Sequence, residues 1–470
     1  MSTTNFSVRS IAWPMTVLTS LFFMWGFMTV MNDVLVPHWK KDFDLSYWEG
    51  MSVSLCFFGS YFISSFVYWL LSTWGYDPIV RFGYKRGAVL GLVISAVGCA
   101  LFVPASYLHT FGGFLSALFV LGLGFTLLQI SANPFVAIIG SEDGASSRLN
   151  LAQAFNSLGT TLAPIIGGYL VFNRITDTQS LVVPYLVYCG IFLILAGLLS
   201  VTRLPEPPSL PAKGGHALRH PQVRYGMAAI FSYVGAEVAI GILFINFVKL
   251  PAVMGLEEGT AKFYLSLYWG GAMCGRFLGA LALSDQVQEK WRPGLIAALG
   301  LGLFAFILFI QRVSGGLDLQ ALWPMLALIA INAAAFVVVG RSSSATLGVF
   351  ACLAAMLCGS AMVTHGSWAL WSLVAIGLFN SVMWSNIFTL AIEGLKEDTS
   401  QGSSLLVMMI AGGAVIPKLQ GLMADSSWGL QFSFVVPLVC YAYLAWYGFI
   451  SSSHTSAIAP PSLTDPDRAA

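Results

Sequence analysis

Long apolar runs separated by short polar loops dominate the whole chain. Runs long enough to cross a bilayer lie near residues 11–36, 51–73, 86–104, 112–139, 150–172 and 182–201, and then near 225–248, 261–283, 294–311, 321–340, 345–363, 368–392, 402–423 and 430–450. Because every backbone amide in lipid must be hydrogen-bonded within the protein, runs of this length are expected to be helices. The pattern predicts an all-α polytopic membrane protein with about 14 transmembrane helices.

A polar stretch between residues 202 and 224 divides these runs into a group of six and a group of eight. It holds five prolines and four Lys or Arg residues, a composition that is typical of a linker. We therefore expect an N-terminal six-helix bundle at 1–201, a linker at 202–224, a C-terminal bundle at 225–450 and a tail at 451–470.

The two halves carry an internal repeat in two registers. A shift of 253 residues superposes Asn133 on Asn386, whereas earlier in the chain a shift of 211 residues superposes Gly59 on Gly270. The difference of 42 residues is about the length of one helical hairpin. The repeat predicts two homologous six-helix bundles, the second with an extra two-helix hairpin at about 312–363, an architecture typical of transporters that bind substrate between their halves.

The composition mainly excludes alternatives. With 57% hydrophobic and 9% charged residues, a mean hydropathy of +0.79 and a net charge of +1, the chain cannot cover a water-facing surface with charge. A soluble globule, a disordered chain and a nucleic-acid-binding protein are excluded. The seven cysteines lie in apolar runs without a C-x-x-C pair, and the six histidines fall in loops or tails, so we expect no metal site and no cofactor. The sequence also lacks the acid–base or metal motifs of a membrane enzyme and the output domain of a sensor.

The Lys and Arg residues are distributed unevenly over the loops. With the N-terminus placed in the cytoplasm, fourteen of the 22 basic residues fall in cytoplasmic segments and six on the opposite face. Cytoplasmic loops are those that carry an excess of Lys and Arg. Both termini and the linker are therefore expected to be cytoplasmic.

A few ionisable residues lie deep in the predicted helices, namely Asp33, Glu237, Arg276 and Lys418. Each requires a reason, because burying one costs about 2.5–3.5 kcal/mol or more. Asp33 follows Asn32, and such a pair can bind a polyol or hold a cation, although a carboxylate near a helix end can also reach the interface. Arg276 fits a structural ion pair as well as a functional role, and for Lys418 a structural role is favoured.

Amide side chains form two same-face pairs on neighbouring helices. Gln129 and Asn133 are spaced i, i+4, and Gln153 and Asn156 are spaced i, i+3. Each amide offers a donor and an acceptor, as a ligand rich in hydroxyl groups requires. A single amide of this kind can simply join helices, a contribution of about 0.6 kcal/mol, but two pairs on adjacent helices favour a polar cavity.

The second half adds an amide and an aromatic ring. Asn380 and Trp384 share a face of the predicted helix 368–392, and Trp384 falls in mid-helix rather than at the membrane interface where tryptophan is common. An indole can pack on the apolar face of a pyranose and donate from its N–H. We interpret this pair, with Glu237, as the second wall of the cavity.

Several motifs carry a resemblance to a known family. They are Leu21–Phe27 with Asn32 and Asp33, Ser131–Phe135, Arg148–Ser157, Tyr233–Glu237 and Gly270–Phe277. These stretches resemble the fucose–glucose–galactose permease family of the major facilitator superfamily, closest to its glucose/galactose branch. The resemblance covers most of the chain except the linker, the extra hairpin and the tail.

The resemblance implies roles for individual residues. In that family the aspartate of the Asn-Asp pair, a glutamate in the fourth helix and the asparagine of a Gln-x-x-Asn motif form the sugar and proton site. The corresponding positions are Asp33, Gln129 and Asn156, with Gln153 adjacent. The glutamate is a neutral Gln129 here, so a relay of two carboxylates is not implied.

The loop after the second run carries a motif of the superfamily. Arg81–Arg86 matches it, but the position before the arginine, which is usually acidic, is Val80. The contacts by which this loop closes the cytoplasmic side therefore lack their usual carboxylate.

These observations predict a major facilitator fold that imports a hexose of the glucose/galactose type by cation symport, through alternating access. A symporter for L-fucose or N-acetylglucosamine is an alternative, and an exporter of amphipathic compounds is another. We expect the substrate to be bound by Gln129, Asn133, Gln153, Asn156, Glu237, Asn380 and Trp384, and the cation to be coupled by Asp33 with Asn32.

The expected partners follow from this function. They are the sugar, a co-transported H⁺ or Na⁺, and the lipid of a bacterial cytoplasmic (inner) membrane, with no nucleic acid. We expect the chain to act as a monomer.

Overall fold

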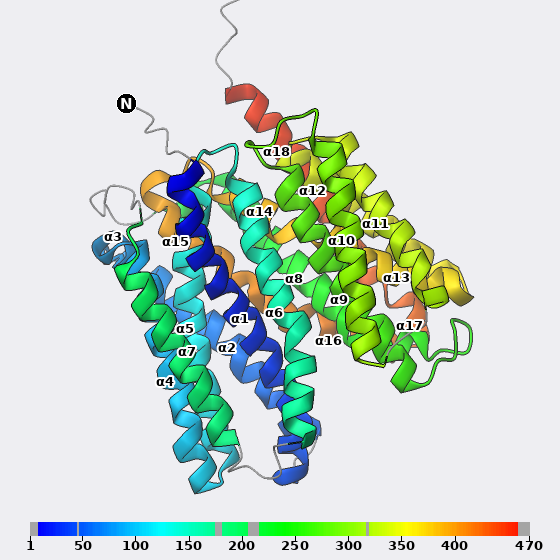
Figure 1. Cartoon of the computed structure of the whole chain (residues 1–470), viewed down its shortest axis with the longest axis horizontal. Helices are drawn as coiled ribbons and strands as arrows, with labels where there is room; N and C mark the ends of the chain where they lie inside the picture. Colours follow the sequence, from blue (N-terminus) through cyan, green and yellow to red (C-terminus); the bar gives the residue numbers. More distant parts are fainter. Residues whose placement is uncertain (1–7, 45–46, 174–180, 205–215, 316–318, 459–470) are drawn as a thin grey trace, which may run out of the picture.

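The computed structural model describes residues 8–44, 47–173, 181–204, 216–315 and 319–458, with the side chains of some helix ends left undescribed. Within these ranges the chain is helical and contains no strand. Figure 1 shows two helical bundles side by side, one blue to cyan-green and the other green to red. The all-α prediction is confirmed.

The first bundle holds the N-terminal helices, and a short helix at one end. Its elements are α1 (Val8–Asp42), α2 (Tyr47–Thr73), the short α3 (Pro78–Phe82), α4 (Tyr84–Leu108), α5 (Phe111–Ile138), α6 (Ala145–Asn173) and α7 (Val182–Val201). Helix α4 packs on α5 and α7, while α1 packs along α6. This arrangement brings the helices that carry the predicted amides, α5 and α6, into contact with each other and with α1.

The second bundle contains more helices, two of which are interrupted. It comprises α8 (Pro221–Val248), α9 (Glu258–Ala282), α10 (Arg292–Val313), α11 (Leu319–Val339), α12 (Ser343–Val363), α13 (Gly366–Asn380), α14 (Met383–Ile392), α15 (Thr399–Met408), α16 (Gly412–Ala424), α17 (Gly429–Phe432) and α18 (Val435–Ile458). Helix α12 packs on α13 and α18, just as α4 packs on α5 and α7. Helices α10 and α11 pack on each other and on α9.

Twelve of the described helical segments are long and apolar enough to cross a membrane. Helices α6 and α9 are outside these twelve, although they are 29 and 25 residues long. In α9 the charged residues Glu258, Lys262 and Arg276 lower the apolar character. The chain is therefore a multi-pass membrane protein.

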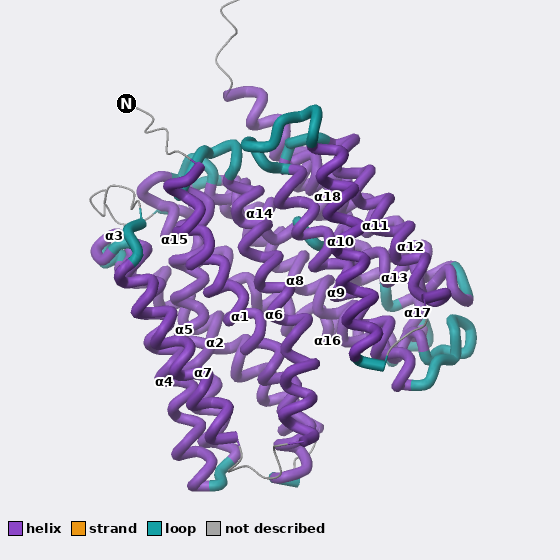
Figure 2. The backbone as a smooth tube through the Cα atoms, in the orientation of Figure 1, coloured by secondary structure: helices purple, strands orange, loops and turns teal. Residues whose placement is uncertain are grey.

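The loops between helices gather at two ends of the molecule (Figure 2). One end, which we call the α3 end, carries α3, the loop at 139–144 and the loop at 393–398. The first turn of α1 and the last turn of α18 lie at this same end (Figure 1).

The run at 368–392, which the sequence predicts as one helix, is broken into α13 and α14 at Ser381 and Val382. The break frees backbone carbonyls, and side chains from other helices bind two of them. Arg276 Nε donates to the Ser381 carbonyl at 3.1 Å, and Asn332 Nδ2 donates to the Leu378 carbonyl at 3.3 Å. Such pairing is required wherever backbone leaves helical geometry at membrane depth.

The run at 402–423 is also interrupted. A 3-10 turn at Met409–Ala411 separates α15 from α16. Short 3-10 stretches within helices often mark hinges. Both interruptions lie in the second bundle, and their partners in the first bundle, α5 and α6, are continuous.

Candidate functional site

The first bundle buries amide side chains without protein partners. Gln129 and Asn133 in α5 are 2% and 0% exposed, and neither the nitrogen nor the oxygen of either amide makes a hydrogen bond. Gln153 in α6 is 3% exposed and its Nε2 is also without a partner. Buried polar groups are normally paired with protein or water, so these amides point to a polar ligand or to water in this region.

Asn156, unlike the unpaired amides, makes a hydrogen bond within the protein. Its Nδ2 donates to the Phe22 carbonyl of α1 at 3.0 Å. The two helices approach closely here, since a Cβ on Gly26 would collide with the Asn156 backbone. Asn156 therefore fastens α1 to α6, and its amide nitrogen is already engaged.

Two aromatic residues extend the polar wall of the first bundle. Trp25 Nε1 donates to the Tyr61 hydroxyl at 3.2 Å. The same hydroxyl lies near the Gln129 amide, without the geometry of a hydrogen bond. Tyr61 thus joins α2 to α1 beside the unpaired amide of α5, and no sequence pattern distinguished it.

The second bundle also buries polar atoms without partners. Asn380 Nδ2 donates to the Tyr268 hydroxyl at 3.0 Å, and that hydroxyl donates to the Glu237 carbonyl at 3.2 Å. Asn380 Oδ1 is buried without a partner, as is the indole nitrogen of Trp384, a residue that is 6% exposed. Trp384 stacks on Phe388, with ring centroids 6.2 Å apart.

Asn380 ends α13 and Trp384 belongs to α14, so the two residues do not lie on one continuous helix. The i, i+4 spacing therefore does not place them on a common helix face. The prediction of a common face assumed an uninterrupted helix. Both residues are nevertheless buried and both retain an unpaired polar atom.

Glu237 and Arg276 form a buried ion pair. Arg276 Nη2 lies 3.4 Å from Glu237 Oε1, and the two side chains are 11% and 12% exposed. The Tyr233 hydroxyl donates to the same Oε1 at 2.8 Å. Arg276 also donates through Nη1 to Ser157 Oγ of α6, so the pair reaches across the bundle interface.

The sequence indicated Glu237 and Arg276, but not the hydroxyls that join them. Tyr233 stands i, i+4 to Glu237, a spacing that could have suggested the contact. Ser157 gave no signal, because hydroxyls are common on membrane helices. Lys418, in contrast, is exposed on α16.

The proposed coupling pair, Asn32 and Asp33, lies in α1, but its side chains are outside the described residues. Its role stays a prediction.

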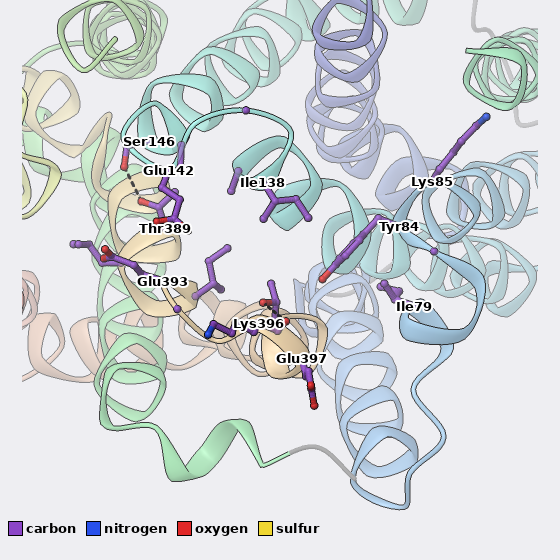
Figure 3. Close-up of a pocket in the computed structure, with 18 of the residues that line it drawn as sticks. Ile79, Tyr84, Lys85, Ile138, Glu142, Ser146, Thr389, Glu393, Lys396 and Glu397 are labelled. Atoms are coloured by element: carbon purple, nitrogen blue, oxygen red, sulfur yellow. Dashed lines mark hydrogen bonds between the residues drawn. The ribbon is translucent and has the colours of Figure 1, made fainter. Parts of the chain in front are cut away.

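Figure 3 shows the described pocket at the α3 end, with a volume of about 1690 Å³. It is lined by both bundles, including Lys85, Glu142, Thr389 and Glu393. None of the predicted substrate-binding residues lines it. This pocket is a vestibule at one end and is separate from the unpaired amides.

Hydroxyl contacts join the two bundles at this end. Ser146 and Thr389 share a hydrogen bond of 2.7 Å, drawn dashed in Figure 3. Ser147 donates to the Ala280 carbonyl at 2.6 Å, and Ser403 to the Ile130 carbonyl at 3.2 Å. The bundles are therefore closed against each other here.

The loop motif has Val80 where an acidic residue is usual, and Asp77 supplies a carboxylate nearby. It is 5% exposed and accepts from the Tyr68 hydroxyl at 2.6 Å, from Ser400 of α15 at 2.6 Å, and from two backbone amides of α3. Beside it, Gln401 donates to Ser72 and Thr73 at 3.1 and 3.0 Å. An acidic residue three positions earlier thus closes this edge of the interface.

One carboxyl group in the loops of this end has a shifted pKa. Partial burial, together with the charges of Glu142 and Asp143, raises the pKa of Glu393 above its ordinary value. Glu393 belongs to the second bundle and the other two acids to the first, so like charges face each other across the interface.

The described residues contain no group of three His, Cys, Asp or Glu side chains that could hold a metal ion. The chemistry available at the candidate site is hydrogen bonding, ring packing and one ion pair.

Comparison with known proteins identifies the family. The profile of the Major Facilitator Superfamily matches residues 16–346. The glucose/galactose transporter of Brucella abortus is 38% identical over 96% of this chain and 97% of its own length, and the putative glucose/galactose transporter of Helicobacter pylori is 35% identical over 92% and 94%. The L-fucose-proton symporter of Escherichia coli is 26% identical over 93% of this chain and 92% of its own length.

Solved structures agree in fold. A structure of the Escherichia coli fucose:proton symporter FucP matches with a TM-score of 0.73 and 25% identity, over 94% of this chain and 99% of that one. FucP in an outward conformation matches with a TM-score of 0.72 over the same shares. The chain therefore belongs to the Major Facilitator Superfamily, and it is a membrane transporter rather than an enzyme.

Proposed function

We propose that the chain is a sugar:cation symporter that imports a hexose of the glucose/galactose type by alternating access. The observation that carries this proposal is the set of buried polar atoms without partners on both bundles: the amides of Gln129, Asn133 and Gln153 on one side, and Asn380 with the Trp384 indole on the other. Hydroxyl groups of a sugar would satisfy these donors and acceptors, and the indole face would cover the ring.

The relatives favour glucose or galactose. The two glucose/galactose transporters are 38% and 35% identical to this chain, against 26% for the L-fucose symporter of Escherichia coli. L-Fucose and N-acetylglucosamine stay alternative substrates. The function of an exporter of amphipathic compounds agrees less well with the site, because an apolar ligand would leave the buried amides without hydrogen-bond partners.

The sugar site proposed here also includes Glu237 and Asn156. Glu237 Oε1 already accepts two hydrogen bonds, and Asn156 Nδ2 already donates to α1. We therefore assign the sugar contacts of these two residues to Glu237 Oε2 and Asn156 Oδ1. The cation, H⁺ or Na⁺, is assigned to Asp33 with Asn32.

Uptake into proteoliposomes tests the function. Purified protein is reconstituted, and labelled glucose, galactose, L-fucose, N-acetylglucosamine and an amphipathic dye are offered with pH and Na⁺ gradients imposed separately. We expect uphill accumulation of glucose or galactose that unlabelled hexose inhibits. Transport of the dye without any hexose would contradict the proposal.

The coupling role of Asp33 is tested by Asp33→Asn. This change removes the titratable charge but keeps the side chain's size, so accumulation should be abolished while sugar exchange continues. Accumulation at the wild-type level would remove Asp33 from the coupling step.

For the membrane arrangement, we propose that the α3 end faces the cytoplasm of a bacterial inner membrane, with both termini there. The excess of Lys and Arg at this end supports that orientation. Closure by hydroxyl contacts at this end, together with the match to FucP in its outward conformation, supports an outward-facing state. We take a monomer as the working unit.

We further propose 14 membrane crossings, adding α6 and α9 to the twelve apolar segments. The inserted hairpin is then α10 and α11, at 292–339 rather than 312–363. The support is packing: α12 contacts α13 and α18 in the way that α4 contacts α5 and α7, so α12 is the counterpart of α4, and α10 and α11 have none.

A further inference from the structure

The ion pair between Glu237 and Arg276 lies between the two walls of the proposed sugar site. On the first bundle, Ser157 stands i, i+4 to Gln153, so the residue that receives Arg276 shares a face of α6 with an unpaired amide. On the second bundle, Tyr268 connects Asn380 to the backbone of Glu237. A change in this pair therefore reaches both sides of the site.

Arg276 is held in place by close helix packing. A Cβ on Gly275 would collide with Ser381 and with the Leu378 carbonyl, which shows how near α9 lies to the break between α13 and α14. From this position the guanidinium donates to the Ser381 carbonyl and to Ser157 as well as to Glu237. A single side chain thus joins α6, α8, α9 and the helix break.

The surroundings of Glu237 leave few other charges to balance it. The titratable groups that face it are Tyr233 on its own helix, Arg276 and Tyr268 on α9, and Tyr441 on α18. Arg276 is the positive partner among them. When the Glu237 carboxylate binds a proton, Arg276 loses its counter-charge while it stays buried. Its remaining partners are then neutral oxygens: the Tyr233 hydroxyl on α8, Ser157 on α6 and the Ser381 carbonyl at the helix break.

We propose that the Glu237–Arg276 pair is a proton-responsive positioning element that links the sugar site to the contact between the bundles. This inference rests on the proposed sugar symport. In the step itself, a proton from water joins the Glu237 carboxylate, no other covalent bond changes, and the same proton leaves to water on the opposite side. Arg276 exchanges its contact with Glu237 for a stronger contact with Ser157, so protonation and bundle closure are linked.

The experiment uses reconstituted full-length protein and two readouts. Counterflow of labelled galactose or glucose at equal pH on both sides reports sugar exchange, and accumulation driven by an imposed pH gradient reports coupling. The double variant Glu237→Gln/Arg276→Gln removes both charges together, which avoids the large penalty of leaving one buried charge alone.

For this double variant we expect counterflow to continue at a reduced rate that no longer varies with pH, and accumulation to fall by at least about fivefold. Ser157→Ala keeps the ion pair and removes the contact with the first bundle. It should keep the pH dependence of counterflow and still lower accumulation. The matched control is Glu258→Gln/Lys262→Gln, an exposed pair on the same helix α9, which should behave like wild type.

A double variant with wild-type pH dependence and accumulation would make the pair a structural ion pair and overturn the proposal. So would wild-type accumulation that a Na⁺ gradient drives and a pH gradient does not. If the double variant is not monodisperse in gel filtration, the test rests on Ser157→Ala. Unchanged accumulation in Ser157→Ala would then contradict the proposed link between the ion pair and the contact of the two bundles. Failure of wild-type protein to exchange any hexose would instead contradict the proposed function.

Discussion

At the scale of single residues, the polar positions within apolar helices carried most of the functional information. Gln129, Gln153 and Asn380 were predicted from their spacing and chemistry, and each is buried with an unpaired polar atom. Ser157, which completes the Arg276 network, could not be predicted, because an isolated hydroxyl within a membrane helix has no distinguishing pattern, whereas the i, i+4 spacing of Tyr233 and Glu237 could have suggested their contact. Asp33 stays a prediction.

The first residue-scale prediction concerns Gln153→Ala. If its unpaired Nε2 binds a sugar hydroxyl, the variant should lose about 1–2 kcal/mol of binding, or roughly a tenfold higher KM for the hexose, with normal folding. Uptake kinetics in proteoliposomes measure this. Gln311→Ala is the matched control, because Gln311 is also 3% exposed but donates to Ser266 of α9, and the KM of this variant should not change.

The second concerns Glu393 and pH. Its raised pKa means that the folded protein holds a proton more tightly than the unfolded chain, so this group lowers stability as pH rises above about 4.5 toward the raised value. Glu393→Gln should therefore raise the melting temperature slightly at neutral pH, and the difference should disappear at acidic pH. Because Glu393 is exposed, the gain should stay below about 1 kcal/mol. A constant difference across the pH range would contradict this origin.

At the scale of elements, apolar length predicted where the helices lie but not where they break. The runs at 368–392 and 402–423 were each predicted as one continuous helix. The break in the first run is stabilised by side chains from distant helices, which the local sequence does not reveal. The contacts of Asp77 were hidden for a similar reason: its carboxylate stands three positions before the expected one and acts through the tertiary partner Ser400.

Asp77→Ala tests the closure at the α3 end. The variant loses the cap of α3 and the contact with α15, together about 1 kcal/mol or more, and this end should open more often. Spin labels at Arg86 and Glu397, which are exposed on opposite bundles, should report a larger population of long distances. Asp425→Asn, an exposed carboxylate elsewhere, is the control, and identical distance distributions in the two variants would contradict the role of Asp77.

At the scale of the whole molecule, the repeat predicted two bundles and an extra hairpin, and the family match confirms the superfamily fold. The exact position of the hairpin could not be predicted from the sequence. The two registers of the repeat limit the insertion only to the region between the matching segments. Helix packing supports our proposal that the hairpin is α10 and α11.

Deletion of residues 292–340 tests this assignment. The ends of the deleted segment meet α9 and α12 at the same side of the bundle, so the remaining helices keep their direction through the membrane. We expect sugar counterflow to persist with a lower melting temperature, since Asn332 no longer pairs with the Leu378 carbonyl. Deletion of 312–363, which includes α12, should abolish folding, and equal behaviour of the two deletions would contradict the assignment.

The closure at the α3 end has a physiological consequence. Within the described residues the contacts between bundles at this end are made by hydroxyls, amides, backbone carbonyls and the carboxylates of Asp77 and Asp285, which accept from serine hydroxyls, and no ion pair joins the two bundles. Salt screens opposite charges but has little effect on neutral hydrogen bonds. The neutral hydroxyl contacts should therefore persist as the osmolarity of the cell changes, whereas the charged groups that face each other here, Glu393 opposite Glu142 and Asp143, make the remaining part of the balance between the two orientations depend on ionic strength.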